Sequence, residues 1–382
     1  MEEWKECKLG DCVSILGDGL HGTPKYTQNG EYAFINGNNF VNGKIIIKPE
    51  TKRVNENEYQ KYKKNLTDRT IFVSINGTIG NVGTYNGEKI ILGKSACYFN
   101  VLDDIDKTFI RYVVSSSSFK TYLETNATGT TIKNVSLAQM RNYSFLLPPL
   151  PTQQKIAAIL SSLDDKIELN NKVNTNLEQQ ANTLFKNWFA NENNTNSFSL
   201  KQLEEVTENL RERITNQNTP VLSAVNTGKL QRSDEYFSKQ VYSKDISKYI
   251  LVKEGDFAYN PSRVNIGSIG INDLGYDGCV SPVYVAFSVD PDYRSFFKYF
   301  IKSNKFKEEA KTRATGSVRQ TLNYSDFAKI EIKYPPRDLA KQFEAFHSTI
   351  EASKRKIEKE TETLISIRDT LLPRLMNGEI EV

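Results

Sequence analysis

The sequence predicts an α+β protein in which two β-rich globules, in a pseudo-twofold arrangement, are joined by a long antiparallel pair of coiled-coil helices. Phe119-Lys120 recurs further along the chain as Phe306-Lys307, so the chain contains one unit twice. Each copy first shows short β-branched runs between turn signals, which are typical of strands. Each copy ends in a long stretch whose apolar residues alternate at spacings of three and four, which is typical of paired helices.

The separation between Phe119 and Phe306, which we call the repeat offset, also separates further matching motifs of the two copies. Ala127-Thr128-Gly129 corresponds to Ala314-Thr315-Gly316, and Pro148-Pro149 corresponds to Pro335-Pro336. A repeat of this length indicates two copies of a globule followed by a helix. Proteins with such internal symmetry commonly bind partners that are themselves roughly twofold, and duplex DNA is one of them.

Residues 1–151 form the first predicted globule. Three β-branched runs predict strands at 45–47, 71–73 and 90–92. Asn-Gly pairs, which favour tight turns, separate these runs at 29–30, 42–43, 76–77 and 86–87. A helix is predicted over 107–123.

Residues 152–190 form the first predicted spacer helix, because no Gly or Pro interrupts the chain from Thr152 to Phe189. Its predicted heptad seam consists of Ile156, Leu160, Leu163, Ile167, Asn170, Asn174, Leu177, Ala181, Leu184 and Trp188. Polar Asn170 and Asn174 in the middle of a seam cost stability but can fix the register. The alternative is an amphipathic helix that lies on a globule.

Residues 191–337 form the second predicted globule, which begins with a polar linker over 191–199 and has strands at 249–252 and 283–287. Residues 338–382 form the second spacer helix, which Pro373 should kink or end. Its predicted seam consists of Phe343, Phe346, Ile350, Ser353, Ile357, Thr361, Leu364, Ile367, Leu371 and Leu375. The first helix delivers the chain to the second globule, so a helix that packs against it must run back. The pair should be antiparallel and about 57 Å long at ~1.5 Å per residue.

Composition and motifs argue against an enzyme. The four cysteines (Cys7, Cys12, Cys97 and Cys279) lack metal-ligand spacing, and the only histidines are His21 and His347. We expect reduced thiols, a solvated loop for His21 and an exposed helix position for His347. The chain has no apolar run of membrane-spanning length and an acidic N-terminus, so we expect it to be cytoplasmic.

Three motifs that resemble enzyme signatures have structural explanations. Gly77, Gly80 and Gly83 lack the order of a phosphate-binding loop, and hairpin turns explain them better. The proline pairs and Asn260-Pro261-Ser262 lack features of the methyltransferase motif that they partly match. Paired carboxylates such as Asp164-Asp165 are typical of solvated helix faces.

Basic and polar stretches remain as candidate nucleic-acid contacts, although the surplus of cations is only three in each globule. One basic stretch is interleaved with aromatic residues that should face a core, and its cations are Arg294, Lys298, Lys302, Lys305, Lys307, Lys311, Arg313 and Arg319. The Thr-Gly loops that begin at Thr128 and Thr315 offer small donors for phosphates and base edges. The candidate DNA-binding residues are Lys25, Asn76, Thr78, Lys94, Thr130, Thr131, Lys133, Asn134, Asn260, Arg263, Arg313, Ser317, Arg319 and Gln320. Solvated faces and structural loop junctions are the alternatives.

Several motifs together resemble one family over the whole chain. The stretches 148–167 and 184–189 resemble the central region of DNA specificity subunits of type I restriction-modification systems, and 371–380 resembles their C-terminal region. The two Ala-Thr-Gly motifs resemble the ends of their target-recognition domains.

This resemblance implies a non-catalytic subunit with two target-recognition domains, each of which reads one half of a bipartite DNA site. It also implies that the helices dock two methyltransferase subunits, for which the candidate residues are Phe185, Trp188, Phe189, Leu372, Leu375 and Met376. Restriction subunits should join the complex. S-adenosylmethionine, ATP and Mg²⁺ should bind to partner subunits and none of them to this chain. Because the globules differ in sequence, the site should be asymmetric. The alternative is a protein scaffold or an orphan or decoy subunit that reads no DNA.

Overall fold

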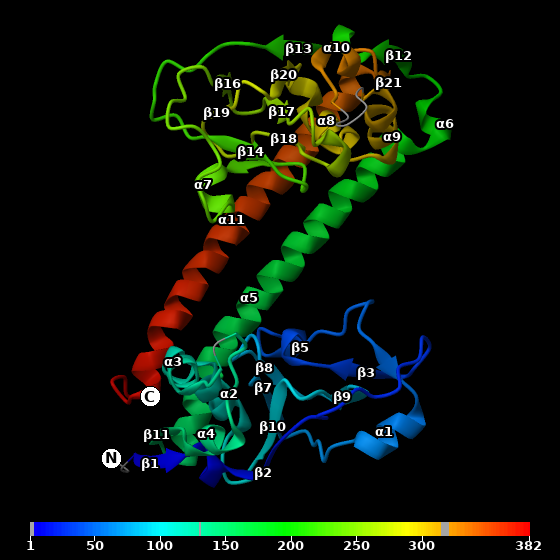
Figure 1. The fold of residues 1–382 in the computed structure, drawn as a ribbon. Helices are drawn as coiled ribbons and strands as arrows, with labels where there is room; N and C mark the ends of the chain where they lie inside the picture. The colour runs from blue at the N-terminus through cyan, green and yellow to red at the C-terminus, as the bar shows by residue number, and fades with distance from the viewer. Residues whose placement is uncertain (1–3, 130, 315–320) are drawn as a thin grey trace. The chain divides into compact units, whose positions relative to one another are not determined.

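The computed structural model of the chain describes residues 4–129, 131–314 and 321–382. It divides into two compact units, one of Met1–Asn170 with Lys359–Val382 and one of Asn171–Glu358. Each unit holds one globule and a stretch of both long helices, α5 (Leu150–Phe185) and α11 (Arg337–Met376) (Figure 1). The boundary between the units therefore lies inside the two helices.

The first unit is built on a four-stranded antiparallel sheet. Its strands, in order, are β2 (Val13–Asp18), β10 (Ala96–Val101), β7 (Thr70–Ser74) and β8 (Val82–Thr84). A second sheet has the order β6 (Arg53–Val54), β3 (Tyr32–Ile35) and β9 (Ile90–Leu92). Two strand pairs complete the unit, β1 (Lys5–Lys8) with β11 (Ser144–Leu147) and β4 (Phe40–Val41) with β5 (Lys44–Ile45). The short helix α1 (Glu56–Tyr62) precedes β7.

The predicted strands at 71–73 and 90–92 are confirmed, and the run at 45–47 contributes only its first residue to β5. The turns at 42–43 and 76–77 are confirmed, whereas Gly83, predicted to lie in a hairpin turn, belongs to strand β8, where a side chain would collide with the Phe40 ring. Asn42 and Gly43 both have positive φ, as a tight hairpin turn between β4 and β5 requires. Gly77 and Gly80 have positive φ in the loop that joins β7 to β8, so turn geometry explains these glycines.

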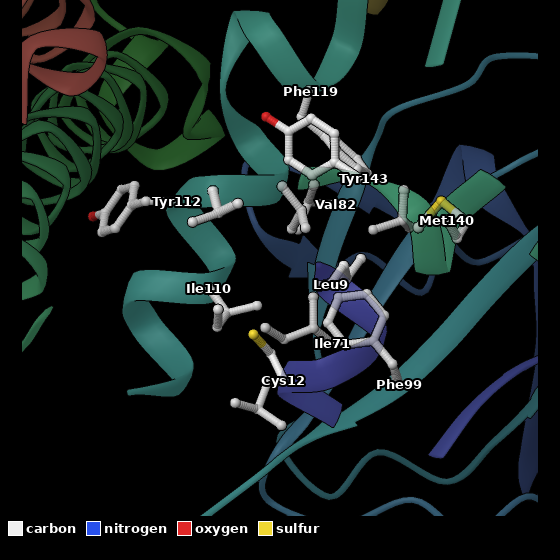
Figure 2. Packing of buried hydrophobic residues seen from close by; sticks show 14 of the residues in the cluster. Leu9, Cys12, Ile71, Val82, Phe99, Ile110, Tyr112, Phe119, Met140 and Tyr143 are labelled. Carbon is white, nitrogen blue, oxygen red and sulfur yellow. The ribbon is translucent and has the colours of Figure 1, made fainter. Parts of the chain in front are cut away.

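The core of the first unit lies between the four-stranded sheet and helices α2 (Lys107–Ser115), α3 (Ser117–Asn126) and α4 (Leu137–Asn142). Figure 2 shows the packing of some of its buried side chains, with Phe99 from the sheet and Phe119 from α3. Ile156, Ala157 and Leu160 at the start of α5 also belong to this core, as does Leu375 near the end of α11. The core therefore attaches both helices to the globule.

The single helix predicted over 107–123 is wrong, because the chain breaks it at Ser116. The Ser116 side chain accepts a hydrogen bond from the Phe119 amide and caps α3. Ser303 caps α9 (Asn304–Arg313) in the same way through the Phe306 amide. Both phenylalanines are fully buried. The repeated Phe-Lys motif is thus a helix start with a cap and a core anchor.

The second unit repeats the central sheet of the first. Its strands, in order, are β13 (Thr207–Leu210), β20 (Val285–Val289), β17 (Phe257–Tyr259) and β18 (Ile269–Ile271), all antiparallel. Three further pairs are β12 (Ser199–Gln202) with β21 (Glu331–Tyr334), β14 (Leu222–Ala224) with β15 (Leu230–Arg232), and β16 (Ile250–Val252) with β19 (Gly278–Val280). The helices of this globule are α6 (Glu192–Thr195), α7 (Ser233–Tyr236), α8 (Arg294–Phe300), α9 and α10 (Tyr324–Phe327). The central sheets match, whereas the outer sheets differ between the units.

Both long helices begin at the repeated proline pairs, as predicted. The carbonyl of Pro149 accepts from Thr152 and Gln153, and the carbonyl of Pro336 accepts from Leu339 and Ala340. Helix α5 thus begins two residues before the predicted start at 152 and ends in a π-helical turn over Lys186–Ala190. Helix α11 continues through Pro373, which therefore does not end it.

The helices are antiparallel in each unit. In the first unit Asp164 contacts Arg368, and Asn170 donates to Glu360 (3.0 Å) and Thr361 (3.2 Å). In the second unit Phe185 packs on Phe343. The predicted seam of the first helix is confirmed, because all of its residues are buried or half-buried. Asn170 pins the register with its two hydrogen bonds, as predicted.

The predicted seam of the second helix is wrong at three positions. Phe346, Ser353 and Ile367 are exposed. The buried or half-buried residues one position later are His347, Lys354 and Arg368. When these three residues replace the predicted ones, every residue of the second seam lies one repeat offset after its counterpart in the first seam. The prediction failed because His347, Lys354 and Arg368 are polar, and each of them has a partner within its own unit.

His347 is buried, with 4% of its surface exposed, which corrects the predicted exposed position. Its Nδ1 atom is 2.8 Å from the hydroxyl of Ser295 on α8. Burial lowers the pKa of His347 to about 4, and the charge of Lys298 acts in the same direction. The imidazole is therefore neutral at pH 7.

We expect the second unit to lose stability as the pH falls from about 7.5 to about 5. Unfolded His347 titrates near pH ~6.5, whereas the pKa in the folded unit is about 4. Between these values the unfolded state binds a proton that the folded state excludes, which costs on the order of 2 kcal/mol at pH ~5. Urea unfolding at both pH values, followed by Trp188 fluorescence in a Trp4→Phe background, measures the loss.

The His347→Gln variant is the control for this measurement. It keeps a polar side chain at the position but removes the titrating group, so its unfolding midpoint should change less with pH than that of the parent protein. Glu351, whose pKa is also lowered, titrates below this pH range. Equal pH dependence of the two proteins would contradict the assignment.

Candidate nucleic-acid interface

Two loops of the first globule form one polar surface. The loop from β7 to β8 carries Asn76 and Thr78, and the loop before α4 carries Thr131, Lys133 and Asn134. Backbone hydrogen bonds join the two loops, from the Gly77 amide to the Lys133 carbonyl (3.1 Å) and from the Val135 amide to the Ile75 carbonyl (2.8 Å). We call this surface, made of residues 76–78 and 131–134, the first loop surface.

The side chains of the first loop surface are open to solvent or partly so. The Asn76 amide donates to the Asn134 amide oxygen (3.2 Å), which leaves the Asn134 amino group and the Asn76 oxygen for other partners. An amino group beside an amide oxygen matches the donor and acceptor that an adenine presents in the major groove. The pair thus has the chemistry for reading a base edge.

Three lysines lie at this surface without a carboxylate partner among the described residues. Lys133 belongs to the surface itself. Lys94 precedes Ser95, whose carbonyl accepts from the Ile75 amide (2.9 Å), and the Lys120 side chain lies against Gly80 in the β7–β8 loop. All three are exposed. Unpaired ammonium groups beside small hydrogen-bond donors suit a phosphate backbone.

The fold adds amide residues that the sequence-based candidate list missed. Ser95 donates to Asn36 (2.9 Å) and accepts from the Gly37 amide (2.9 Å), while Asn81 of the β7–β8 loop donates to the Gly37 carbonyl (3.3 Å). The turn that contains Asn36 and exposed Asn38 is thereby joined to the first loop surface. The signal in the sequence is the amide-rich run at 36–39.

Lys25 lies apart from this surface, whereas His21 directly follows Leu20, which pairs with Gly93 next to Lys94. Lys25 is exposed, but its amide donates to Glu58 of α1, and no contact among the described residues joins it to the other candidates. His21 is an exposed loop residue in contact with Asp18, which confirms the predicted loop position.

The second globule has an equivalent loop between β17 and β18. It carries Asn260 and Arg263, and the Leu322 amide donates to the Pro261 carbonyl (3.1 Å). At the repeat offset Leu322 corresponds to Val135, which makes the matching bond to Ile75 in the first globule. The Asn260 side chain accepts from the Ser262 amide, and Arg263 is exposed. The backbone connection is repeated, but the side chains around it are different.

The basic stretch of the second globule is only partly available to a ligand. Its aromatic residues Phe296, Phe297, Phe300 and Phe306 are buried in the core, as predicted. Lys298, predicted to face outward, is instead 7% exposed and pairs with Asp273 (3.0 Å). Arg313 pairs with Glu309 (3.0 Å). The exposed lysines of the stretch are Lys305, Lys307 and Lys311.

Four of the candidate DNA-binding residues, Thr130, Ser317, Arg319 and Gln320, lie outside the described residues.

The candidate docking residues mostly contribute to the cores of their own units. Phe185 and Phe189 belong to the core of the second unit, and Leu375 belongs to that of the first. Trp188, Leu372 and Met376 are half-buried against the same cores.

Within residues 4–129, 131–314 and 321–382, no group of three or more His, Cys, Asp or Glu side chains could hold a metal ion. No helix in the same ranges is long and apolar enough to cross a membrane.

The fold and the loops define a tandem protein made of two globule-and-helix units with a shared sheet scaffold and divergent loops. Residues 1–179 match the family model of the type I restriction modification DNA specificity domain. Curated specificity subunits of type I restriction systems are similar to this chain over nearly its full length.

Two curated relatives and one solved structure illustrate the similarity. The MjaIX specificity subunit of Methanocaldococcus jannaschii is 24% identical over 100% of this chain and 94% of its own length. A putative type I specificity subunit of Mycoplasma pneumoniae is 23% identical over 97% and 96%. The crystal structure of an S subunit from M. genitalium, 18% identical, covers 98% of this chain and 96% of its own with a TM-score of 0.61, which shows the shared fold.

We expect Lys133→Ala to weaken DNA binding by the assembled complex by a similar factor for cognate and unrelated duplexes. A phosphate contact carries no sequence information, and its loss should reduce the slope of log K against log salt by about 1. Fluorescence anisotropy titrations of labelled duplexes at several salt concentrations measure both quantities.

The matched control for this experiment is Lys5→Ala, which removes an exposed lysine of β1 that contacts neither loop. It should leave the slope unchanged. A wild-type slope in the Lys133→Ala protein would remove Lys133 from the interface.

Proposed function

We propose that the chain is the sequence-specific DNA-binding subunit of a type I restriction-modification complex, in which each globule reads one half of a bipartite site. The observation that carries the proposal is the repeated backbone bond under two different loops, Val135 to Ile75 and Leu322 to Pro261. One scaffold thus holds two different sets of side chains in equivalent places. Such an arrangement suits the reading of two different half-sites.

The first loop surface and the two lysines beside it, Lys94 and Lys120, supply both parts of this task. Lys94, Lys120 and Lys133 can neutralise phosphates and so set the position on the duplex. The amides of Asn76 and Asn134 can contact base edges. In the second globule, Arg263 of the equivalent loop suits guanine, to which arginine binds with two hydrogen bonds.

We propose further that the spacer helices dock two methyltransferase subunits and that restriction subunits join the complex. Because Phe185, Phe189 and Leu375 are buried in the chain's own cores, other side chains should make these contacts. Exposed apolar residues of the first unit's helical stretches support this view, among them Ile159 (37% exposed), Leu169 (55%) and Ile367 (42%). Isolated apolar side chains of this kind become buried when a partner helix packs on them.

We propose that the chain itself carries out no catalysis. The methyltransferase subunits would bind S-adenosylmethionine, and the restriction subunits would bind ATP and Mg²⁺. The thiols of Cys12, Cys97 and Cys279 are buried, and burial raises the pKa of each, so they are poor nucleophiles at neutral pH.

We expect methylome sequencing of a host with and without the gene to reveal one gene-dependent adenine motif in two parts. The two halves should differ in sequence and be separated by unspecified bases, because the two loops differ in their side chains. A palindromic motif would contradict the asymmetry, and the absence of any gene-dependent motif, with the partner methyltransferase expressed, would contradict DNA reading.

A further inference from the structure

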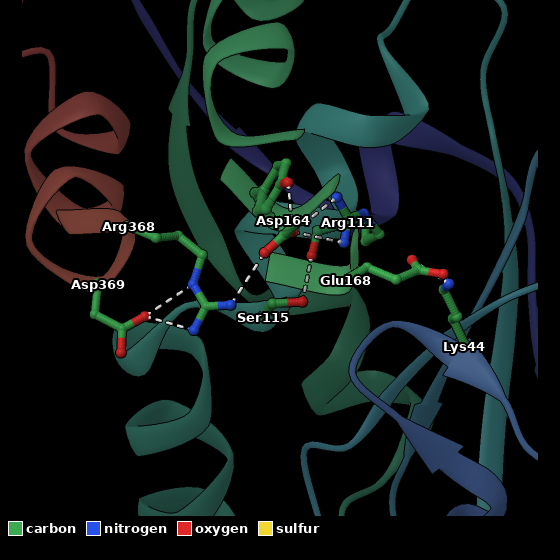
Figure 3. Close-up of polar contacts among 8 residues, drawn as sticks. Lys44, Arg111, Ser115, Asp164, Glu168, Arg368 and Asp369 are labelled. Carbon is green, nitrogen blue, oxygen red and sulfur yellow. Dashed lines mark hydrogen bonds and ion pairs between the residues drawn. The ribbon is translucent and has the colours of Figure 1, made fainter. Parts of the chain in front are cut away.

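The carboxylate of Asp164 on α5 connects three helices of the first unit (Figure 3). Arg111 of α2 approaches one carboxylate oxygen at 3.4 Å, and Tyr112 of the same helix donates to that oxygen at 2.6 Å. Arg368 of α11 donates to the other oxygen at 3.0 Å. We call Asp164, Arg111, Tyr112 and Arg368 the first carboxylate hub. It joins the globule to both spacer helices and corrects the prediction that Asp164 lies on a solvated face.

A second hub occupies the equivalent place in the second unit. At the repeat offset, Glu351 of α11 corresponds to Asp164, and Lys298 of α8 corresponds to Arg111. The Lys298 ammonium is 3.4 Å from the Glu351 carboxylate, and the Lys354 ammonium is 3.5 Å from it. Lys354 also faces Glu178 of α5 at 3.9 Å. We call Glu351, Lys298 and Lys354 the second carboxylate hub, and it too joins a globule helix to both spacer helices.

Each hub is the middle one of three successive attachments along its spacer helix. In the first unit, Ile156 and Leu160 pack in the core, Asp164 follows one turn later, and Glu168 contacts Lys44 one turn after that. In the second unit, Phe343 packs in the core, Glu351 follows two turns later, and Arg355 donates to the Asp273 carbonyl (3.4 Å). Arg355 corresponds to Glu168 at the repeat offset. All three attachments therefore lie at equivalent sequence positions in the two copies of the repeat.

Stability alone does not explain the hubs. Removing charges from water offsets most of their attraction, so a partly buried ion pair is often no more stable than apolar residues of similar size. Apolar packing at the start of a helix is non-directional, and it leaves the angle between globule and helix weakly defined. Charged hydrogen bonds with fixed geometry, placed further along the helix, define that angle.

We propose that the two carboxylate hubs are positioning elements that set the angle at which each globule is held on its spacer helix. This inference rests on the proposed function, in which each globule reads one half-site. The angle then determines how strictly the complex requires one number of base pairs between the half-sites. Asp164 and Glu351 are the central residues of this device, and neither of them needs to contact DNA.

The test measures methylation by the complete complex on a series of plasmids. The plasmids carry the two half-sites at the native spacing and with one base pair added or removed. For Asp164→Asn and for Glu351→Gln, we expect methylation at the altered spacings, relative to the native spacing, to rise about tenfold, the size of effect expected when one pair interaction is lost. The base preference within each half-site should not change.

The chain offers matched controls. Asp165→Asn and Glu358→Gln remove exposed carboxylates near the hubs and should keep the wild-type ratio. Arg111→Lys and Lys298→Arg exchange the cations that the two repeats use at equivalent places, so each should keep the ratio close to that of the wild type. If Asp164→Asn and Glu351→Gln acted only by lowering stability, they would not differ from the control variants in spacing preference.

An unchanged ratio in both Asp164→Asn and Glu351→Gln would overturn the proposal, whether or not the total rate falls. Loss of folded protein in both variants, seen by circular dichroism, would make the hubs folding elements and would also overturn it. If the wild-type complex methylates no bipartite site, the proposed function fails and the inference falls with it. If the wild type methylates one spacing and the variants match it, only the inference fails.

Discussion

A carboxylate held between helices must be paired, because an unpaired buried charge costs several kilocalories per mole. Asp164 meets this constraint with one cation from the globule and one from the opposite helix, and Glu351 meets it with Lys298 and Lys354. Burial alone would raise the pKa of Glu351, but Lys298 and Lys354 lower it to about 2, so the carboxylate stays ionised. The need for a paired charge therefore requires cationic side chains next to each of the two carboxylates. The polar seam positions of α11 follow from it, since Arg368 and Lys354 serve the hubs and His347 lies beside Glu351.

This constraint also explains which parts of the fold could be predicted from the sequence. The repeat offset and the heptad pattern were sufficient for the two globules, the helix starts and the antiparallel pair, because each depends on local signals such as proline pairs and apolar spacing. The seam of α11 was assigned wrongly where apolar Phe346 and Ile367 stood next to His347 and Arg368. Hydrophobicity favours Phe346 and Ile367 as seam residues. The repeat offset, counted from the first seam, identifies His347 and Arg368 instead. Polar seam residues are recognisable only once their partners on other elements are known.

Only part of the candidate interface could be predicted from the sequence. Asn76 and Asn134 were identified from turn and loop chemistry, and the fold brings them within hydrogen-bonding distance. Asn36 and Ser95 were missed because residues so far apart in the sequence meet only through the pairing of distant strands. Phe185 and Phe189 were assigned to docking because the family resemblance implies methyltransferase contacts on the spacer helices. In the structure they pack on Phe296 and Phe343 in the core, and composition alone does not separate these two roles.

Duplication has therefore left two kinds of position in this chain. Positions that hold a globule on its helix keep their place at the repeat offset, and the central pair keeps its charges, from Arg111 to Lys298 and from Asp164 to Glu351. Positions in the β7–β8 and β17–β18 loops keep a backbone hydrogen bond but change their side chains freely. A loop can vary in this way only if its anchoring does not depend on the side chains that vary. Because the bond under each loop joins backbone atoms, the side chains of the loop can diverge without loss of the sheet beneath it. Because the hubs lie outside the loops, the loops can also change without altering the contacts that hold each globule on its helix.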